Sequence, residues 1–104
     1  MNWNTPRNTQ LVRALLSLKT SDEARRFLRD LMTEKEIKEF ANRLQTAELL
    51  SAKTPYSEIE QKTGLSPTTV ARVSKWLNGK EGGYRIIIDR LHHTNSIQVR
   101  RGLS

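Results

Sequence analysis

Hydroxyl and cationic side chains gather in one short stretch, Ser66-Pro-Thr-Thr-Val-Ala-Arg-Val-Ser-Lys75. Hydroxyls and free amides at a helix start bind phosphate oxygens, and Arg and Lys bind phosphates or guanine edges. At about 100° per residue, a helix through this stretch would carry its short polar and basic side chains on one face. We therefore expect contacts with duplex DNA from Ser66, Pro67, Thr68, Thr69, Ala71, Arg72 and Lys75.

Catalytic and metal-binding patterns are not found in the sequence. The acidic residues are scattered, and no Ser/His/Asp set, metal-spaced cluster or phosphate-binding glycine loop emerges. The adjacent pair His92 and His93 would point apart on a helix, and the chain has no cysteine. We expect neither enzymatic activity nor a bound metal.

Two short helices joined by a tight turn, over residues 54–78, would position the polar face. Thr54 is expected to cap the first helix, with Pro55 at its first position. Gly64 can adopt the left-handed conformation that ends a helix, and Ser66 can cap the second. The apolar residues of the pair would face one core, as in a helix-turn-helix: Ile59, Leu65, Val70, Val73 and Leu77.

Four further helices complete an all-α chain of about six helices. Periodic apolar residues predict helices over residues 5–19, from Thr20 or Ser21 onward, over 34–52 and over 84–93. The third follows a capping box formed by Thr33 and Glu36. These helices carry more apolar surface than a small monomer needs, which indicates a homodimer.

Length and charge set the remaining expectations. The 104 residues, with a net charge of +7, suit one small domain with a polyanionic partner. We expect a single domain over residues 1–93, in which residues 1–53 and 84–93 serve dimerisation, followed by a basic tail over 94–104. No membrane-spanning run or signal-peptide core is present, so we expect a cytoplasmic protein without a membrane partner.

The chain resembles the Trp repressor family, in particular its branch from Gram-positive bacteria. The matching region runs from about Phe27 to Leu91, and its motifs are Leu31-Met-Thr33, Arg43, Glu58-Ile59, Gly64, Thr69-Val70, Arg72 and Leu77. The resemblance implies an intertwined homodimer with a reading head on each side. Such a dimer would recognise a near-palindromic operator with half-sites one helical turn apart.

The resemblance also implies an effector pocket for L-tryptophan. Arg43 and Arg72 align with the family's two carboxylate-binding arginines, and Thr33 aligns with a threonine at the entrance. The family's glycine and serine in this pocket are replaced here by Val73 and Trp76. Both replacements are bulky and narrow the cavity, and Trp76 also takes the place of the serine that contacts the ligand's amino group. Either Trp76 fills the pocket from within, or it packs on the neighbouring helix.

The leading interpretation is a dimeric, sequence-specific DNA-binding transcription regulator, most simply a repressor. The alternative is a helix-turn-helix module that docks on another protein. The two differ in salt dependence, because binding to DNA releases counterions and weakens steeply with salt.

Overall fold

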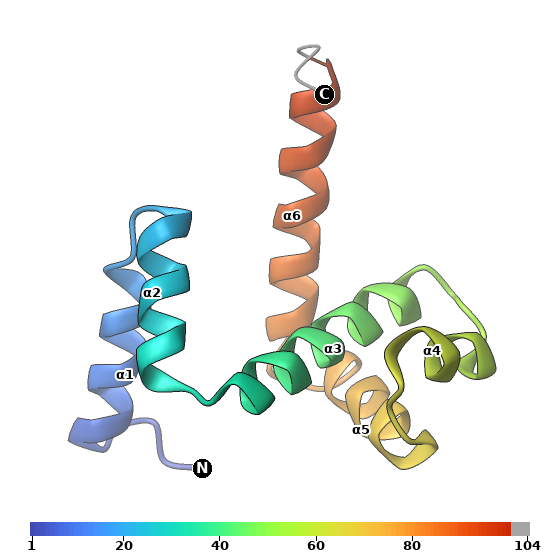
Figure 1. Cartoon of the computed structure of the whole chain (residues 1–104), viewed down its shortest axis with the longest axis horizontal. Coiled ribbons are helices and arrows are strands. Elements are labelled where there is room, and N and C mark those ends of the chain that lie inside the picture. Colours follow the sequence, from blue (N-terminus) through green and yellow to red (C-terminus); the bar gives the residue numbers. More distant parts are fainter. Residues whose placement is uncertain (101–104) are drawn as a thin grey trace. The chain divides into compact units, whose positions relative to one another are not determined.

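The computed structural model describes the backbone of residues 1–100 and the side chains of residues 1–93. Over this range the regular elements are six α-helices and no strand, which confirms the expected all-α class (Figure 1). None of the described helices is long and apolar enough to cross a membrane. The helices are α1 (Pro6–Leu16), α2 (Ser21–Leu31), α3 (Glu34–Ser51), α4 (Tyr56–Thr63), α5 (Pro67–Leu77) and α6 (Gly83–Arg100).

Contacts divide the chain into two compact units, Met1–Ile37 and Lys38–Ser104. The first unit contains α1, α2 and the first turn of α3. The second contains the remainder of α3 and the helices that follow it. The assignment of residues 1–93 to a single domain stays a prediction.

The helices of the first unit begin at side-chain caps. Thr5 accepts the Asn8 amide at the start of α1, and Thr20 accepts the Glu23 amide at the start of α2. α1 ends at Leu16, earlier than the expected Lys19, and the Ser17 hydroxyl then donates to the Ala14 carbonyl. The Ser17 backbone amide also donates to that carbonyl, at 3.2 Å, so side chain and backbone of Ser17 together close the end of α1.

The capping box before α3 is confirmed. The Thr33 hydroxyl accepts the Glu36 amide at 3.1 Å, and Glu36 Oε1 accepts the Thr33 amide at 2.9 Å. The bond from the Thr33 backbone amide, followed by the bond from its hydroxyl, lowers the pKa of the Glu36 carboxyl, against a small opposing effect of desolvation. The sequence therefore specifies the start of α3 locally.

The helix pair agrees with the prediction except at its first residue. α4 begins at Tyr56, not at Pro55, because Pro55 is itself the N-cap: its backbone is extended and its carbonyl accepts the Glu58 and Ile59 amides. Thr54 is therefore not the cap. Gly64 has a φ of 71° and ends α4 as expected, and Ser66 caps α5.

The core of the second unit surrounds α5. Val73 and Leu77 of α5 form a buried cluster with Ala47 of α3 and Ile88 of α6. Leu50 and Tyr84 are half-buried and pack against the cluster. The other predicted core residues of the helix pair, Ile59 and Val70, are fully buried, and Leu65 is half-buried. The long helix and the last helix thus hold α5 from two sides.

The last helix extends beyond the predicted boundary at His93. α6 continues to Arg100, so the expected end of the last helix at His93 is wrong, while the assignment of residues 94–104 to a basic tail stays a prediction. The apolar periodicity fades after Leu91, but neither proline nor glycine occurs before Gly102, and so no residue breaks the backbone pattern. Residues 101–104 lie outside the described part of the chain.

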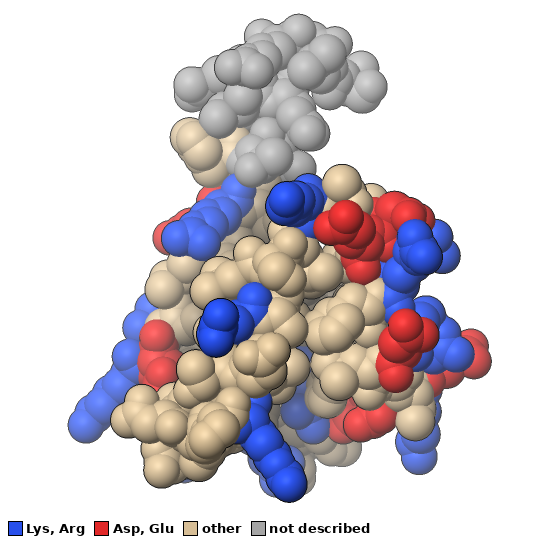
Figure 2. Space-filling view, turned by 90° about the vertical axis from the view of Figure 1, so that its left-hand side faces the viewer, with Lys and Arg blue, Asp and Glu red and all other residues tan. Residues whose placement is uncertain are grey.

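Many apolar side chains that the periodicity placed in helix stripes are exposed. On α1 the exposed residues include Leu15 and Leu16, which are 47% and 80% exposed. Among the described side chains of α6, the exposed large apolar ones are Ile86, Ile87 and Leu91, and Phe40 is exposed on α3. Figure 2 shows one side of the molecule, on which uncharged atoms form broad areas between separated charged side chains.

Candidate nucleic-acid interface

The outer face of α5 is polar, basic and accessible. Ser66, Pro67 and Thr68 are exposed at its start, and Ala71, Arg72 and Lys75 are exposed along it. Thr69 is half-buried at the flank. Because Val70, Val73 and Leu77 are buried on the opposite side, the orientation of the helix is fixed by its core contacts. The face predicted to contact DNA is therefore presented to solvent within this chain.

The hydroxyls of Ser66 and Thr69 form a pair at the N-terminus of α5. They lie 3.0 Å apart, and Ser66 Oγ also accepts the Thr69 amide at 3.2 Å. Either hydroxyl can be the donor within the pair, so the other hydroxyl retains its proton for an outside acceptor. A helix N-terminus with a spare hydroxyl donor suits a phosphate oxygen.

The two cations of this face have no acidic partner among the described residues. Arg72 and Lys75 take part in no ion pair there. By contrast, Lys62 of α4 lies 3.4 Å from Glu58, one helical turn away. The positive charge on α5 is therefore available to an external anion, whereas the charge at Lys62 is compensated on its own helix.

Arg43 of α3 lies among aromatic side chains. Its guanidinium carbon is 5.5 Å from the centre of the Phe40 ring and 5.8 Å from that of the Trp76 ring, distances typical of cation–π contacts. Its Nη2 donates to Glu39 Oε1 at 2.9 Å. Burial raises the pKa of the neighbouring Tyr84, and the charge of Arg43 opposes that rise. Arg43 is thus already engaged by its own chain.

The residues expected in an effector pocket are not all brought together. Trp76 lies against Arg43, with 45% of its surface exposed, while Val73 is fully buried in the core. Arg72 is exposed on the outer face of α5. Thr33 belongs to the first unit, where its hydroxyl serves the capping box. Of the expected set, the structure pairs Arg43 with Trp76.

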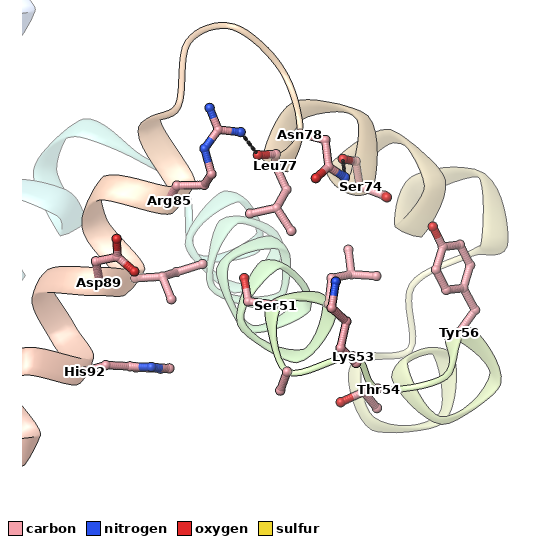
Figure 3. A pocket seen from close by; sticks show the side chains of 13 residues that line it. Ser51, Lys53, Thr54, Tyr56, Ser74, Leu77, Asn78, Arg85, Asp89 and His92 are labelled. Atoms are coloured by element: carbon pink, nitrogen blue, oxygen red, sulfur yellow. Dashed lines mark hydrogen bonds between the residues drawn. The ribbon is translucent and has the colours of Figure 1, made fainter.

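An open cavity of about 660 Å³ lies on the other flank of α5. Its lining includes the apolar Leu50, Leu77 and Ile88. The polar lining residues Tyr56 and His92 lie on opposite sides of it (Figure 3). None of the residues predicted for the effector pocket lines it. Within the described residues, no group of His, Cys, Asp or Glu could hold a metal ion.

Sequence reasoning did not identify Glu39, Phe40 or Arg85 as partners of the predicted residues. Glu39 and Phe40 precede Arg43 by four and three residues, a spacing that places side chains together on a helix, so a signal was present. Arg85 contacts the end of α5 across a loop. That contact depends on the path of the loop, which residue spacing does not reveal.

The chain has relatives in sequence and structure. Residues 7–92 match the family described as Trp repressor protein. A Bacillus subtilis (strain 168) protein described as uncharacterized protein YerC is 39% identical over 87 residues, which cover 84% of each chain. The crystal structure of a TrpR-like protein from Eubacterium eligens ATCC 27750 is similar, with a TM-score of 0.81 and 38% identity. That match covers 86% of this chain and 93% of the other.

Proposed function

The chain belongs to the Trp repressor family, and from that premise we propose that it is a sequence-specific DNA-binding transcription regulator, most simply a repressor that acts by occupying its operator. The observation that carries this proposal is the exposed outer face of α5, on which Arg72 and Lys75 have no acidic partner among the described residues. The family is one of non-enzymatic regulators, in agreement with the expectation that the chain is not an enzyme.

In the proposed complex α5 is the reading helix and enters the major groove. Arg72 and Lys75 bind phosphates or guanine edges, and the hydroxyl pair of Ser66 and Thr69 supplies a donor to a phosphate at the helix start. Thr68 and Ala71 are short enough to let the helix approach the bases. The rigid ring of Pro67 packs beside the sugar-phosphate backbone of the DNA. Gly64 in the turn and the buried residues of α5 fix the orientation of α5 relative to the rest of the second unit.

The regulator acts as a homodimer. The exposed apolar side chains of α1 and α6, among them Leu15, Leu16 and Ile87, form surface that a second copy can cover. The family resemblance supplies the intertwined arrangement, in which a two-fold axis relates two reading heads. A near-palindromic operator follows from that symmetry.

We further propose that Trp76 replaces an outside effector. In this family arrangement Arg43 would bind the carboxylate of L-tryptophan, but here its guanidinium already lies against the Trp76 and Phe40 rings and pairs with Glu39. Val73, which stands where the family has a glycine, is fully buried in the core of the second unit. The reading helix is then held in place by the protein's own indole, and DNA binding does not require free tryptophan.

The experiment that tests the proposed function is selection of bound sequences from a random duplex pool by the purified protein. We expect a two-fold symmetric motif whose half-sites lie about one helical turn apart. Parallel selections with and without L-tryptophan should yield the same motif. Failure to enrich any sequence, at low ionic strength and in both conditions, would remove the proposal.

Docking on another protein is the second candidate. A partner protein would bind the same exposed face of α5. Docking does not explain why this face combines cations that have no acidic partner among the described residues with hydroxyls at the helix start. Such a module would show little affinity for duplex DNA at any salt concentration. The selection therefore separates the two candidates.

A further inference from the structure

Arg85, near the start of α6, contacts the end of the reading helix. Its Nη1 donates to the Leu77 carbonyl (dashed in Figure 3), and its Nη2 donates to the Gly79 carbonyl at 3.0 Å. The last carbonyls of an α-helix have no partner within the helix, and they lie at the negative end of its dipole. A forked cation at this position therefore satisfies two acceptors and neutralises partial charge at once.

The loop between the two helices is shaped around this guanidinium. Gly82 has a φ of 69°, and a Cβ at this position would lie 3.2 Å from Arg85 Nη2. At Gly79 a Cβ would lie 3.2 Å from the Lys75 carbonyl oxygen. A side chain at either glycine would displace the loop or the guanidinium. The two glycines thus keep the path that lets Arg85 reach back to α5.

α6 packs against the reading helix on one side and carries exposed apolar side chains on another. Ile88 packs in the buried cluster with Val73 and Leu77 of α5. Ile86 and Ile87 directly follow Arg85 and are exposed. A second copy that covered these two side chains would hold α6, and the hydrogen bonds of Arg85 would carry that constraint to the end of α5.

We propose that Arg85 is a positioning residue that ties the reading helix to α6, and that it thereby sets the distance between the two reading helices of the dimer. This inference rests on the proposed function. It assigns to Arg85 a part in selecting half-site spacing, although Arg85 itself does not contact the bases.

The test compares Arg85→Met, Arg85→Lys and the control Lys80→Met, which removes an exposed cation of the loop between α5 and α6. Methionine keeps the packing of the stem but removes the donors, and lysine keeps the charge without the fork. Affinity is measured for the selected operator and for operators with one base pair inserted or removed between the half-sites. Sedimentation equilibrium reports the dimer.

We expect Arg85→Met to remain dimeric. It should bind the selected operator roughly tenfold more weakly, because two charge-assisted hydrogen bonds are lost. It should also discriminate less between operators that differ in half-site spacing. Arg85→Lys should fall between Arg85→Met and the wild type, while Lys80→Met should match the wild type. If Arg85→Met is dimeric and keeps wild-type affinity and spacing preference, the inference is wrong. If Arg85→Met does not fold, Arg85→Lys decides by the same criteria.

Failure of the proposed function gives a different result. In that case the wild type itself binds no duplex, and hydrogen exchange then tests the tie alone. The Asn78 and Gly79 amides, which bond to Ser74 and Trp76 carbonyls at the end of α5, should exchange faster in Arg85→Met than in the wild type. Equal rates would refute the tie between Arg85 and the helix end.

Discussion

Single residues determine how α5, the proposed reading helix, is presented and which side chains it exposes. Gly64 supplies a left-handed backbone conformation that other residues adopt at a cost. Arg43 pairs with Glu39 through Nη2 and lies against two aromatic rings, while its buried Nε has no hydrogen-bond partner among the described residues. Arg72, one turn before Trp76 on α5, remains without an acidic partner in the described structure. The two arginines that the family resemblance assigns to one ligand therefore have different surroundings.

The turn can be tested by Gly64→Ala. A Cβ at this position would meet no atom within 4 Å, so the substitution adds no steric contact and costs the left-handed φ of 71° alone. We expect a loss of roughly 1–2 kcal/mol in the free energy of unfolding, measured by urea denaturation. Gly83→Ala is the control: its Cβ would also meet open space, but its φ is not positive. Equal effects of the two substitutions would contradict this account of the turn.

The effector proposal makes a prediction for calorimetry. Titration of the wild type with L-tryptophan should give no binding in the micromolar range, because Trp76 already lies against Arg43. Trp76→Ser removes the indole and leaves the guanidinium with Phe40 and Glu39. Indole-bearing carboxylates should then bind more tightly to the variant than to the wild type. Micromolar binding of L-tryptophan by the wild type would overturn the proposal.

At the scale of elements, the starts of helices are specified more firmly than their ends. Thr33 and Ser66 accept amides at the positions where a cap was expected, and Thr5 and Thr20 do so at the starts of α1 and α2, whereas Pro55 replaces Thr54 as the cap of α4. Each such bond joins residues three apart in the chain, so the sequence alone contains the information. Helix ends depend on packing as well as on local signals.

The capping box of α3 gives a pH dependence with a definite sign. The bonds from Thr33 lower the pKa of the Glu36 carboxyl from its usual 4.5 in the folded chain. Its ionised form therefore stabilises the folded state above that value, and the contribution is lost as pH falls through the lowered folded pKa. The difference in unfolding free energy between the wild type and Glu36→Gln should thus shrink on acidification. A difference that grew toward acidic pH would contradict the capping box.

Sequence predicted the helix pair and its core but not every contact around it. The caps, the left-handed Gly64 and the buried Val70, Val73 and Leu77 follow from local rules. Pro55 took the cap position because its own carbonyl accepts the first amides of α4. The bonds of Arg85 could not be predicted, since they join residues across a loop whose path depends on its glycines.

At the scale of the whole molecule, exposed apolar surface and net charge support the proposed dimer and its proposed polyanionic partner. The net charge of +7 favours association with nucleic acid at low salt. Apolar side chains left exposed on α1, α3 and α6 favour association with a second copy. Together these properties suit a dimer on duplex DNA.

Dimerisation is tested by a charge on α1. Leu16 is 80% exposed in the isolated chain, so Leu16→Lys should leave the fold of the single chain intact while opposing burial of this surface in a dimer. Sedimentation equilibrium should show monomer at concentrations where the wild type is dimeric. The control is Gln10→Lys, an exposed polar position of the same helix, which should remain dimeric. A dimeric Leu16→Lys would exclude this part of α1 from the interface.

The salt dependence of operator binding tests the role of the α5 face most directly. Fluorescence anisotropy would give the affinity of the wild type, Arg72→Ala, Lys75→Ala and the control Lys35→Ala, an exposed lysine of α3, over a range of salt concentrations. A phosphate contact contributes about 0.9 to the slope of log affinity against log salt. Loss of the Lys75 contact from both subunits should therefore reduce the slope by about 1.8, and Arg72→Ala should weaken binding, whereas Lys35→Ala should match the wild type. Binding that is insensitive to salt, or unchanged in both α5 variants, would contradict the role assigned to this helix face.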